Sequence, residues 1–506
     1  MLNLEPQTRL LALLNITAFV LSMLQLKDEV EDVLPHKIYC EKENVAVLFI
    51  LLSFNCFYVI SANLDFKLRL TFFFIQFMAV WSLVLDKSRL NYSLNMMHWI
   101  FVLIHYFYAP IAQISNGRFP WKSSFTAGQL LATNALVILW CFCYKFVYSL
   151  LTRNRDDWNV ADGYKMIDAS KIPNYKSEQI MFYVGLLITV FSIAKFGSSL
   201  VSSREAFDSK LAGSGQIFTL IFKTMFRAFT VTSLALLMWK DSVVRNRGYG
   251  VRTYVLLLCV LILYFPTNSG RLWILSIYMG IVLVHLFRLK HKSTLFVLMI
   301  FGVIYLAALI NVFRFAASGL GDFFEAILKG LNVSDRLSNG DFDCYTMITR
   351  TLSYAGTKGI TNGRQLLGAF LFWVPRSIWP TKSVGSGSTV LAYQGSDFTN
   401  VSSPIIAEGY INFGVFGVML FALIYAIVCY KIDCRACRFR KTGEYNSGSF
   451  SDNIQFVYGV IVGYSYLLLR GDLLTALSNL IGILMPVFFL TIINRFNIRK
   501  GTGYVQ

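Results

Sequence analysis

Charged side chains are scarce in this chain, and acidic ones are scarcer than basic ones. Only 15% of the 506 residues are Asp, Glu, Lys or Arg, whereas 56% are hydrophobic. Soluble proteins carry about 25% charged residues, so this composition excludes an ordinary soluble protein and predicts a polytopic membrane protein. The net charge is nevertheless +18. Because Lys and Arg collect in the cytoplasmic loops of membrane proteins, we attribute this charge to topology and expect no nucleic-acid partner.

The signatures of several enzyme classes are also missing. The chain has no Walker loop, no dinucleotide-binding glycine fingerprint, no HExxH or GxSxG motif and no DxD-type cluster. We therefore expect a reaction that needs neither a cofactor nor a metal. The nine cysteines suggest no disulfide framework. Cys434 and Cys437 have the spacing of a zinc half-site, but no second pair or His lies nearby, which favours chance spacing.

What the chain does have is a long series of apolar segments. A helix needs roughly 20 apolar residues to cross a bilayer, so the series predicts an all-α fold with about 12–14 transmembrane helices. The segments lie at about 10–26, 45–64, 68–85, 98–115, 128–151, 180–197, 216–239, 253–269, 272–289, 294–315, 405–430, 454–470 and 473–493.

The connecting loops orient these helices. Five loops are rich in Lys and Arg and fall on one side of the membrane, which predicts that this side is cytoplasmic: 153–176, 240–252, 288–292, 431–441 and 495–500. The largest hydrophilic insertion then lies outside. The order predicts N-terminal helices over 1–315, a large external loop over 316–404, and C-terminal helices with a cytoplasmic tail over 405–506.

The stretch from Gly363 to Gly414 departs from the pattern of the other apolar segments. It opens with an apolar run, Leu366 to Val374, that is too short to span a bilayer as a helix. Prolines, tryptophans and two cations follow, and then a Gly/Ser/Thr-rich run over 383–403. The pattern predicts a short interfacial or re-entrant helix that ends in a cationic turn, followed by a mobile flap. The alternative is an ordinary outer loop with a helix lying on the membrane surface.

Cations at the external ends of the spans are the first candidates for a site. Lys223 and Arg227 are four residues apart and therefore share one helix face, too deep for Arg227 to reach water easily. Other cations share this side: Arg204, Arg271, Arg314, Arg350, Arg364, Arg376, Lys382 and Arg470. Arginine matches phosphate oxygens, so the set favours a lipid phosphate or diphosphate as ligand. The alternative is that each cation binds bulk lipid headgroups or a carboxylate of a neighbouring helix.

Carboxylates and aromatic residues on the same side suggest further roles. Glu408 is the first candidate for a general base, and its alternative role is a buried ion pair with Arg376 or Arg470. Asp397, Glu205 and Asp472 are the other acids of this side; Asp472 follows Arg470-Gly471, a triplet typical of a turn. Aromatic rings near the flap could stack on sugars, although membrane interfaces also attract Trp and Tyr. These rings belong to Trp373, Trp379, Tyr393 and Tyr410.

Three parts of the sequence carry a family resemblance. They are the block GRQLLGAFLFWVPRSIWPTKSVG with the following SSPIIAEGYINFG, the stretch Tyr108–Gln113 with Gly117–Trp121, and Leu469–Asp472. Together with the late external loop, they resemble the Wzy-type O-antigen (oligosaccharide repeat-unit) polymerases of bacteria. Members of that family have been described with an Arg, ten residues, Gly pattern in two periplasmic loops, and Arg204–Gly215 and Arg376–Gly387 fit it.

The resemblance implies a multi-pass glycosyltransferase of the bacterial inner membrane, GT-C-like in architecture, with its active site facing the periplasm. It would transfer a growing chain from undecaprenyl diphosphate to a lipid-linked repeat unit, with a chain-length-regulating co-polymerase as an expected partner. Glu408 and Arg376 would be catalytic. Cations would bind the diphosphate: Arg204, Lys223, Arg227, Arg271, Arg314, Arg364, Lys382 and Arg470. The sugars would contact Trp373, Trp379, Tyr393, Asp397 and Tyr410.

Two other activities would use a similar ligand. O-antigen ligases resemble one another in a His of a periplasmic loop, whereas the histidines here are His36, His98, His105, His285 and His291, none in the large external loop. A lipid-linked oligosaccharide flippase should show paired halves with interrupted spans in corresponding positions, whereas this chain has one asymmetric insertion and no repeat. We therefore place the polymerase first, with ligase and flippase as alternatives.

Overall fold

The computed structural model describes residues 62–84, 92–153, 175–245, 248–286, 336–395 and 400–502, with Leu90 and a few positions between 52 and 60. The apolar segments predicted at 10–26 and 294–315, and most of that at 45–64, lie outside these residues. So do Arg314 and Asp397. Within the described part the chain is helical, and its only β-type pairing is an isolated bridge between Phe119 and Ser123.

Seven helical segments of the described residues are long and apolar enough to cross a membrane, which confirms a multi-pass, all-α membrane protein. They are α3 (Phe66–Val84); α4, η1 and α5 in one line (Leu94–Val102, Leu103–Tyr108, Ala109–Ser115); α6 (Ala127–Thr152); α7 (Tyr175–Phe196); α9, η6, α10 and η7 in one line (Gln216–Ile221, Phe222–Phe226, Arg227–Trp239, Lys240–Val244); α20 (Ile405–Thr442); and α22 (Leu473–Thr502). Shorter apolar helices α11 (Val251–Leu263) and α12 (Arg271–His285) and the buried α21 (Phe450–Arg470) complete the bundle.

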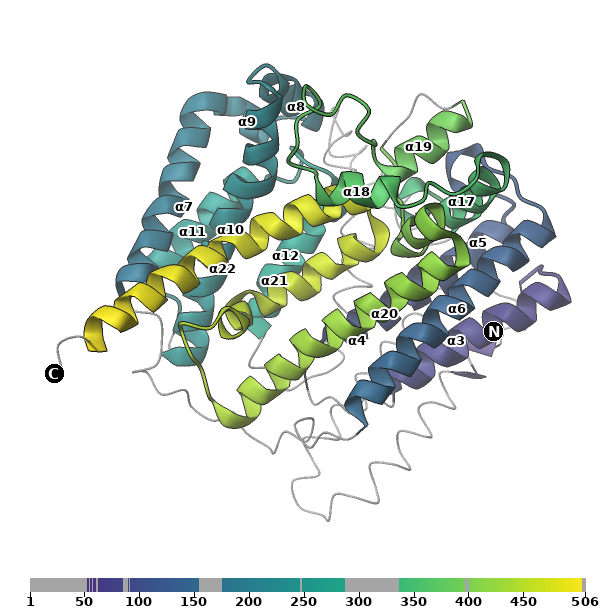
Figure 1. The fold of residues 1–506 in the computed structure, drawn as a ribbon, viewed down its shortest axis with the longest axis horizontal. Coiled ribbons are helices and arrows are strands. Elements are labelled where there is room, and N and C mark those ends of the chain that lie inside the picture. The colour runs from purple at the N-terminus through teal and green to yellow at the C-terminus, as the bar shows by residue number, and fades with distance from the viewer. Residues whose placement is uncertain are drawn as a thin grey trace, which may run out of the picture.

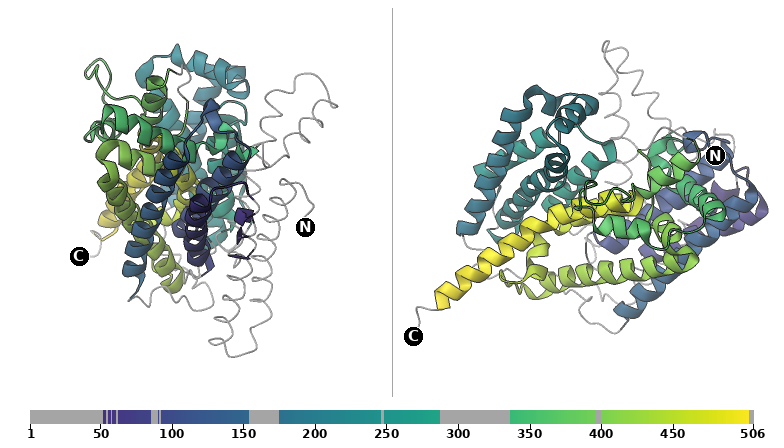
Figure 2. Two further views of the ribbon diagram at one scale, coloured as in Figure 1. Left: turned by 90° about the vertical axis from the view of Figure 1, so that its right-hand side faces the viewer. Right: turned by 45° about the horizontal axis from the view of Figure 1, so that its top comes forward.

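Figure 1 shows that the two ends of the bundle differ. The upper end carries the short helices α8 (Arg204–Ala212), α17 (Cys344–Lys358), α18 (Arg364–Phe370) and α19 (Ser386–Tyr393). The lower end carries the last turns of α6, α20 and α22, and the last turns of α20 hold the basic run 431–441. In Figure 2, right, α22 begins between the teal helices α7–α12 and the green helices α17–α20.

A close contact between α12 and α21 brings Arg271 and Arg470 to the same end of the bundle. Helices α12 and α21 pack so tightly that a Cβ added to Gly280 would lie 2.8 Å from the Cα atom of Val460. Gly459 and Gly463 of α21 are equally close to the α12 backbone, as expected of small residues at a membrane helix interface. Because Arg271 begins α12 and Arg470 ends α21, this antiparallel contact places both cations at the upper end.

The segment 336–404 is more helical than the sequence suggested. Helix α17 was not predicted, yet all residues from Cys344 to Thr351 are buried, against α6 and α20. The short apolar run forms only the seven residues of α18. Helix α19 occupies 386–393, within the run that the sequence predicts as a mobile flap. The apolar residues of α17 follow helical spacing among many Thr and Ser residues, so a hydropathy window reads the segment as a loop.

Helix α20 is broken near its start. Phe413 and Gly414 have non-helical dihedrals, and Gly414 has φ +62°. The carbonyls of Ile411 and Asn412 accept bonds from the N–H groups of Thr361 and Gly363, at 2.8 and 3.2 Å. Backbone that leaves the helix at this depth is therefore satisfied by protein, as a membrane environment requires.

A second irregularity lies in the helix that carries Lys223. Residues Phe222–Phe226 form a π-helical turn, η6, against α22. A Cβ added to Gly482 of α22 would lie 1.7 Å from the carbonyl oxygen of Thr224, so the two backbones touch. π-Helical turns widen a helix and recur at functional sites. Here the turn sets the direction of Lys223 and Arg227.

Candidate functional site

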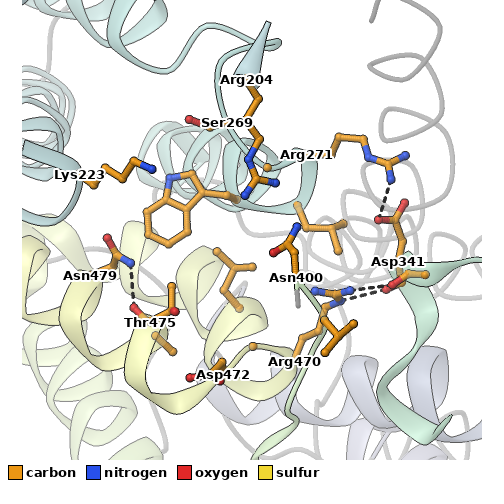
Figure 3. A pocket seen from close by; sticks show the side chains of 18 of the residues that line it. Arg204, Lys223, Ser269, Arg271, Asp341, Asn400, Arg470, Asp472, Thr475 and Asn479 are labelled. Carbon is orange, nitrogen blue, oxygen red and sulfur yellow. Dashed lines mark hydrogen bonds and ion pairs between the residues drawn. The ribbon is translucent and has the colours of Figure 1, made fainter. Parts of the chain in front are cut away.

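A cavity of about 600 Å³ opens at the upper end of the bundle. Its walls come from η2 (Pro120–Lys122), α8, η6, α10, the start of α12, the end of α21, the start of α22 with the turn between them, and the three segments 268–270, 339–341 and 400–401. Five basic and three acidic side chains line it, a formal charge of +2: Arg204, Lys223, Arg227, Arg271 and Arg470, with Asp208, Asp341 and Asp472. Figure 3 shows Arg204 and Lys223 on one side and Arg271, Arg470 and Asp341 on the other. The structure thus brings together five of the cations chosen from the sequence.

Asp208 holds the cations of the first side. Its Oδ1 atom lies 2.7 Å from Nζ of Lys223, and its Oδ2 atom lies 3.4 Å from Nε of Arg204. Ser203 caps α8 and fixes its first turn. The lysine and Asp208 side chains are 40% and 34% exposed, so water screens the pair and an incoming anion can compete for it.

Arg227 differs from the other cavity cations because its partners are neutral. The Nη2 atom donates to Oδ1 of Asn268 at 3.3 Å and to Oγ of Ser269 at 2.8 Å. Its guanidinium lies 4.1 Å from the ring centroid of Tyr264. The side chain is buried, and its Nε atom has no hydrogen-bond partner among the described residues. No described carboxylate forms an ion pair with this buried guanidinium, and a buried charge in that position favours an anionic ligand.

The opposite side is built around two aspartates. Arg271 lies 3.3 Å from Asp341, and Arg470 lies 3.1 Å from Asp343. Arg470 also donates to the carbonyl oxygens of Gly340 and Asp341, at 2.8 and 3.0 Å. It therefore joins the end of α21 to residues 340–343 as well as carrying charge into the cavity.

The other sequence-selected cations lie elsewhere. Lys382 donates to the carbonyl oxygens of Phe372 and Val374, at 2.6 and 3.0 Å, and Arg376 donates to that of Lys382 at 2.8 Å. Arg364 donates to the carbonyl oxygen of Thr381 at 2.9 Å. None of these three cations lines the cavity. They bind the backbone of the turn after α18, where burial lowers the pKa of the Lys382 ammonium.

Two tryptophans that we did not select, Trp121 and Trp273, line the cavity. Trp121 donates from Nε1 to Asp343 at 3.0 Å, and its backbone has φ +60°, which is rare for a bulky residue. Arg350 of α17 holds the Trp121 carbonyl oxygen at 2.9 Å. In the sequence, the family resemblance at Gly117–Trp121 was the feature that pointed to Trp121.

The aromatic residues that we did select for sugar binding do not line the cavity. Trp373 and Tyr393 are exposed, and Trp379 and Tyr410 are half-buried. Tyr393 packs edge-on against Tyr354 of α17. These rings therefore surround the short helices of the upper end rather than the cavity.

The carboxylate chosen as general base is close to the cavity but is sealed from it. Glu408 is 2% exposed and does not line the cavity. Its Oε2 atom accepts from Oγ of Ser386 at 2.8 Å, and its Oε1 atom accepts from the N–H group of Leu473 at 3.1 Å. It makes no ion pair with Arg376 or Arg470, the alternative that the sequence left open. Asp472, one residue before Leu473, does line the cavity.

Comparison with known proteins identifies no relative. No protein-family model, curated protein or solved structure matches this chain. Among the described residues, no group of three or more His, Cys, Asp or Glu could hold a metal ion.

Proposed function

We propose that this protein is an inner-membrane polymerase of the Wzy type, which joins undecaprenyl-diphosphate-linked oligosaccharide repeat units on the periplasmic face. The observation that carries the proposal is the net positive cavity at the ends of apolar helices. The diphosphate of a polyprenyl lipid lies at headgroup level, where such a cavity can receive it. A chain-length-regulating co-polymerase is a proposed partner.

The cavity residues support a division of labour. In the reaction, an acceptor hydroxyl oxygen bonds to the anomeric carbon of the donor as the bond from that carbon to the diphosphate oxygen breaks. The electron pair leaves with the diphosphate, whose charge fixed cations can stabilise. Arg227 has neutral partners only, and Lys223 can exchange Asp208 for a phosphate oxygen. Trp121 and Trp273 offer ring faces for the sugars.

The position of the cavity favours glycosyl transfer over flipping. A transporter binds its substrate near the bilayer midplane, in a site that each side reaches in turn. Here the cationic side chains gather at one end of the bundle, opposite the basic run 431–441. A ligase would share the donor, so only the acceptor separates the two activities.

Deletion of the gene in its native host tests the proposal. Gel separation of the lipopolysaccharide should then show lipid A-core with a single repeat unit and no ladder, because flipping and ligation survive. The wild-type gene and the control Glu444→Gln, an exposed carboxylate distant from the cavity, should restore the ladder, whereas Arg227→Ala should not. Complete loss of O-antigen would favour ligase or flippase. An unchanged ladder would contradict an O-antigen role.

A further inference from the structure

The three carboxylates of the cavity are not equivalent. Asp208 is paired with Lys223 and Asp341 is paired with Arg271. Asp472 makes no ion pair with any described residue; its Oδ1 atom accepts from the N–H group of Leu474 at 3.0 Å. A carboxylate held by neutral donors keeps its affinity for a proton better than one next to a cation. Asp472 is therefore the cavity group best suited to accept one.

Asp472 also contacts the first turn of α19. The carboxylate lies close enough to the N–H groups of Ser386 and Gly387 for these groups to favour its ionised form. A Cβ added to Gly385 would lie only 1.9 Å from its Oδ2 atom. Gly385 has φ −53°, which any residue can adopt, so a glycine is needed here for space and not for backbone shape. The α19 segment thus fits closely against this one carboxylate.

Glu408 also helps to hold Asp472 and the first turn of α19 together. One of its oxygens holds the N–H group of Leu473, next to Asp472, and the other accepts from the Ser386 hydroxyl. It therefore ties the α21–α22 turn to α19 while remaining buried itself. An acceptor sugar in the cavity can reach Asp472 but not Glu408.

We propose that Asp472, not Glu408, takes the proton of the acceptor hydroxyl, and that Glu408 is a positioning residue that fixes Asp472 and the first turn of α19. This inference rests on the proposed function. As the hydroxyl oxygen bonds to the anomeric carbon and the diphosphate leaves with its electron pair, the hydroxyl proton passes to an Asp472 oxygen. Asp472 returns the proton to water after the products leave.

The surroundings of Asp472 suit this role. Burial raises the pKa of its carboxyl above the ordinary range. A general base is most effective when its pKa approaches the working pH, and such catalysis is worth about 10²- to 10⁴-fold in rate. Asp472 also caps α22, through Leu474. Asn is an equally good cap, so Asp472→Asn removes the basic group without removing the cap.

The test compares variants of the reconstituted protein with purified lipid-linked repeat units. Asp472→Asn should lower kcat by about 10²- to 10⁴-fold with an unchanged melting temperature. Glu408→Gln, whose amide can keep both hydrogen bonds, should retain most of the activity. Glu408→Ala should lower kcat and move the acid limb of the pH profile without abolishing it, because the Glu408 and Asp472 carboxyls interact. Glu444→Gln is the matched control far from the cavity.

The opposite ranking would overturn the inference. Asp472 is not the base if Asp472→Asn keeps its kcat. The same holds if the fall in kcat of Glu408→Gln is as large as the fall expected for Asp472→Asn. Should Asp472→Asn fail to fold, Gly385→Ala replaces it: the added methyl group displaces the carboxylate, and kcat should fall while Glu408 stays intact. If the wild-type protein makes no polymer at all, the proposed function falls, and this inference with it.

Discussion

Two groups of cations look alike in the sequence but differ in what they bind. The cavity group, Arg204, Lys223, Arg227, Arg271 and Arg470, contacts mainly side chains, three of them carboxylates. The turn group, Arg364, Arg376 and Lys382, donates to backbone carbonyls between Phe372 and Ser383. Only the first group lines the cavity.

The difference shows how a cation near a membrane interface can serve two purposes. After α18 the backbone runs through successive turns, in which the carbonyls of Phe372 and Val374 accept from the Lys382 side chain. An unsatisfied carbonyl is costly wherever water is excluded. Long basic side chains fill that need in the turn group. Side-chain contacts, in contrast, can be exchanged for the oxygen atoms of a ligand. We therefore expect the cavity group to affect turnover and the turn group to affect stability.

Among the variants that compare the two groups of cations, Arg227→Ala should have the largest effect on turnover. It removes the buried cation whose partners are neutral, so the loss should fall on the transition state, by about 10²- to 10³-fold in kcat. The measurement is chain synthesis by the reconstituted protein from purified lipid-linked repeat units. The melting temperature should change little, and Arg227→Lys should recover part of the rate. Normal polymer from Arg227→Ala would contradict the assignment of the cavity group.

Lys382→Met should lower stability and leave turnover unchanged, the reverse of Arg227→Ala. It leaves the carbonyl oxygens of Phe372 and Val374 without their donor, at a cost of about 1–3 kcal/mol for each buried group. Thermal unfolding in detergent should show a clear fall in melting temperature. Turnover per folded molecule should stay near the wild-type value, because Lys382 does not line the cavity. A specific loss of turnover with unchanged stability would move Lys382 into the cavity group.

Gly482→Ala tests whether η6 directs the cavity cations. The new Cβ would lie 1.7 Å from the carbonyl oxygen of Thr224, and overpacking of this kind costs about 1–3 kcal/mol. Displacement of η6 should turn Lys223 away from Asp208, so both stability and turnover should fall, each less than in the two variants above. Gly356→Ala is a matched control, since a Cβ there meets nothing within 4 Å. Equal behaviour of the two variants would contradict the role of η6.

The pH dependence of the reaction should reflect Asp472. Because burial raises the pKa of this carboxyl in the folded protein, it binds a proton at a higher pH than it does in the unfolded chain. Its contribution to stability is therefore present at low pH and is lost as the pH rises through the folded pKa. Turnover has the opposite sign, since the base must be ionised. The acid limb of kcat should lie above the ordinary range of about 3.9 for Asp and should vanish in Asp472→Asn.

The smallest expected effect is that of Trp373→Ala. This side chain is 61% exposed and lies outside the cavity, so turnover should stay close to wild type. Trp273→Ala in the cavity should weaken substrate binding, because it removes a ring on which a sugar can stack. We expect the loss to be about 0.5–1.5 kcal/mol, the contribution of an aromatic pair. Comparison of KM for the two variants measures this. A larger effect of Trp373→Ala would restore the aromatic cluster near α18 as a sugar site.

The sequence predicted the class of fold well because membrane helices are specified by long apolar runs alone. The spans of α3, α6 and α20 begin within about three residues of their predicted positions. It failed at α17, whose buried face is made largely of Thr, Met and Ile among polar neighbours. The sequence did not predict the partners of the cations either. Asp341 and Asp343 meet Arg271 and Arg470 of elements distant in the sequence, and Asp208 meets Lys223 through the turn between α8 and α9.

The candidate base illustrates the same limit. Glu408 and Asp472 were both visible as acids of the external side, and spacing favoured the one within an apolar segment. Which of them faces the cavity depends on the break in α20 and on the fit of α19 against the α21–α22 turn. Neither feature follows from local composition. Both arise from tertiary packing.

The ion pair between Asp208 and Lys223 makes the cavity discriminate among anions by their charge. Any anion that enters the cavity must replace a carboxylate that already neutralises this lysine, so an anion with a single charge exchanges one equal contact for another. An anion with two or more charges can satisfy Lys223 and still engage the guanidinium of Arg227, which forms no ion pair with a described residue. The Asp208–Lys223 pair should therefore favour polyvalent headgroups over chloride and acetate.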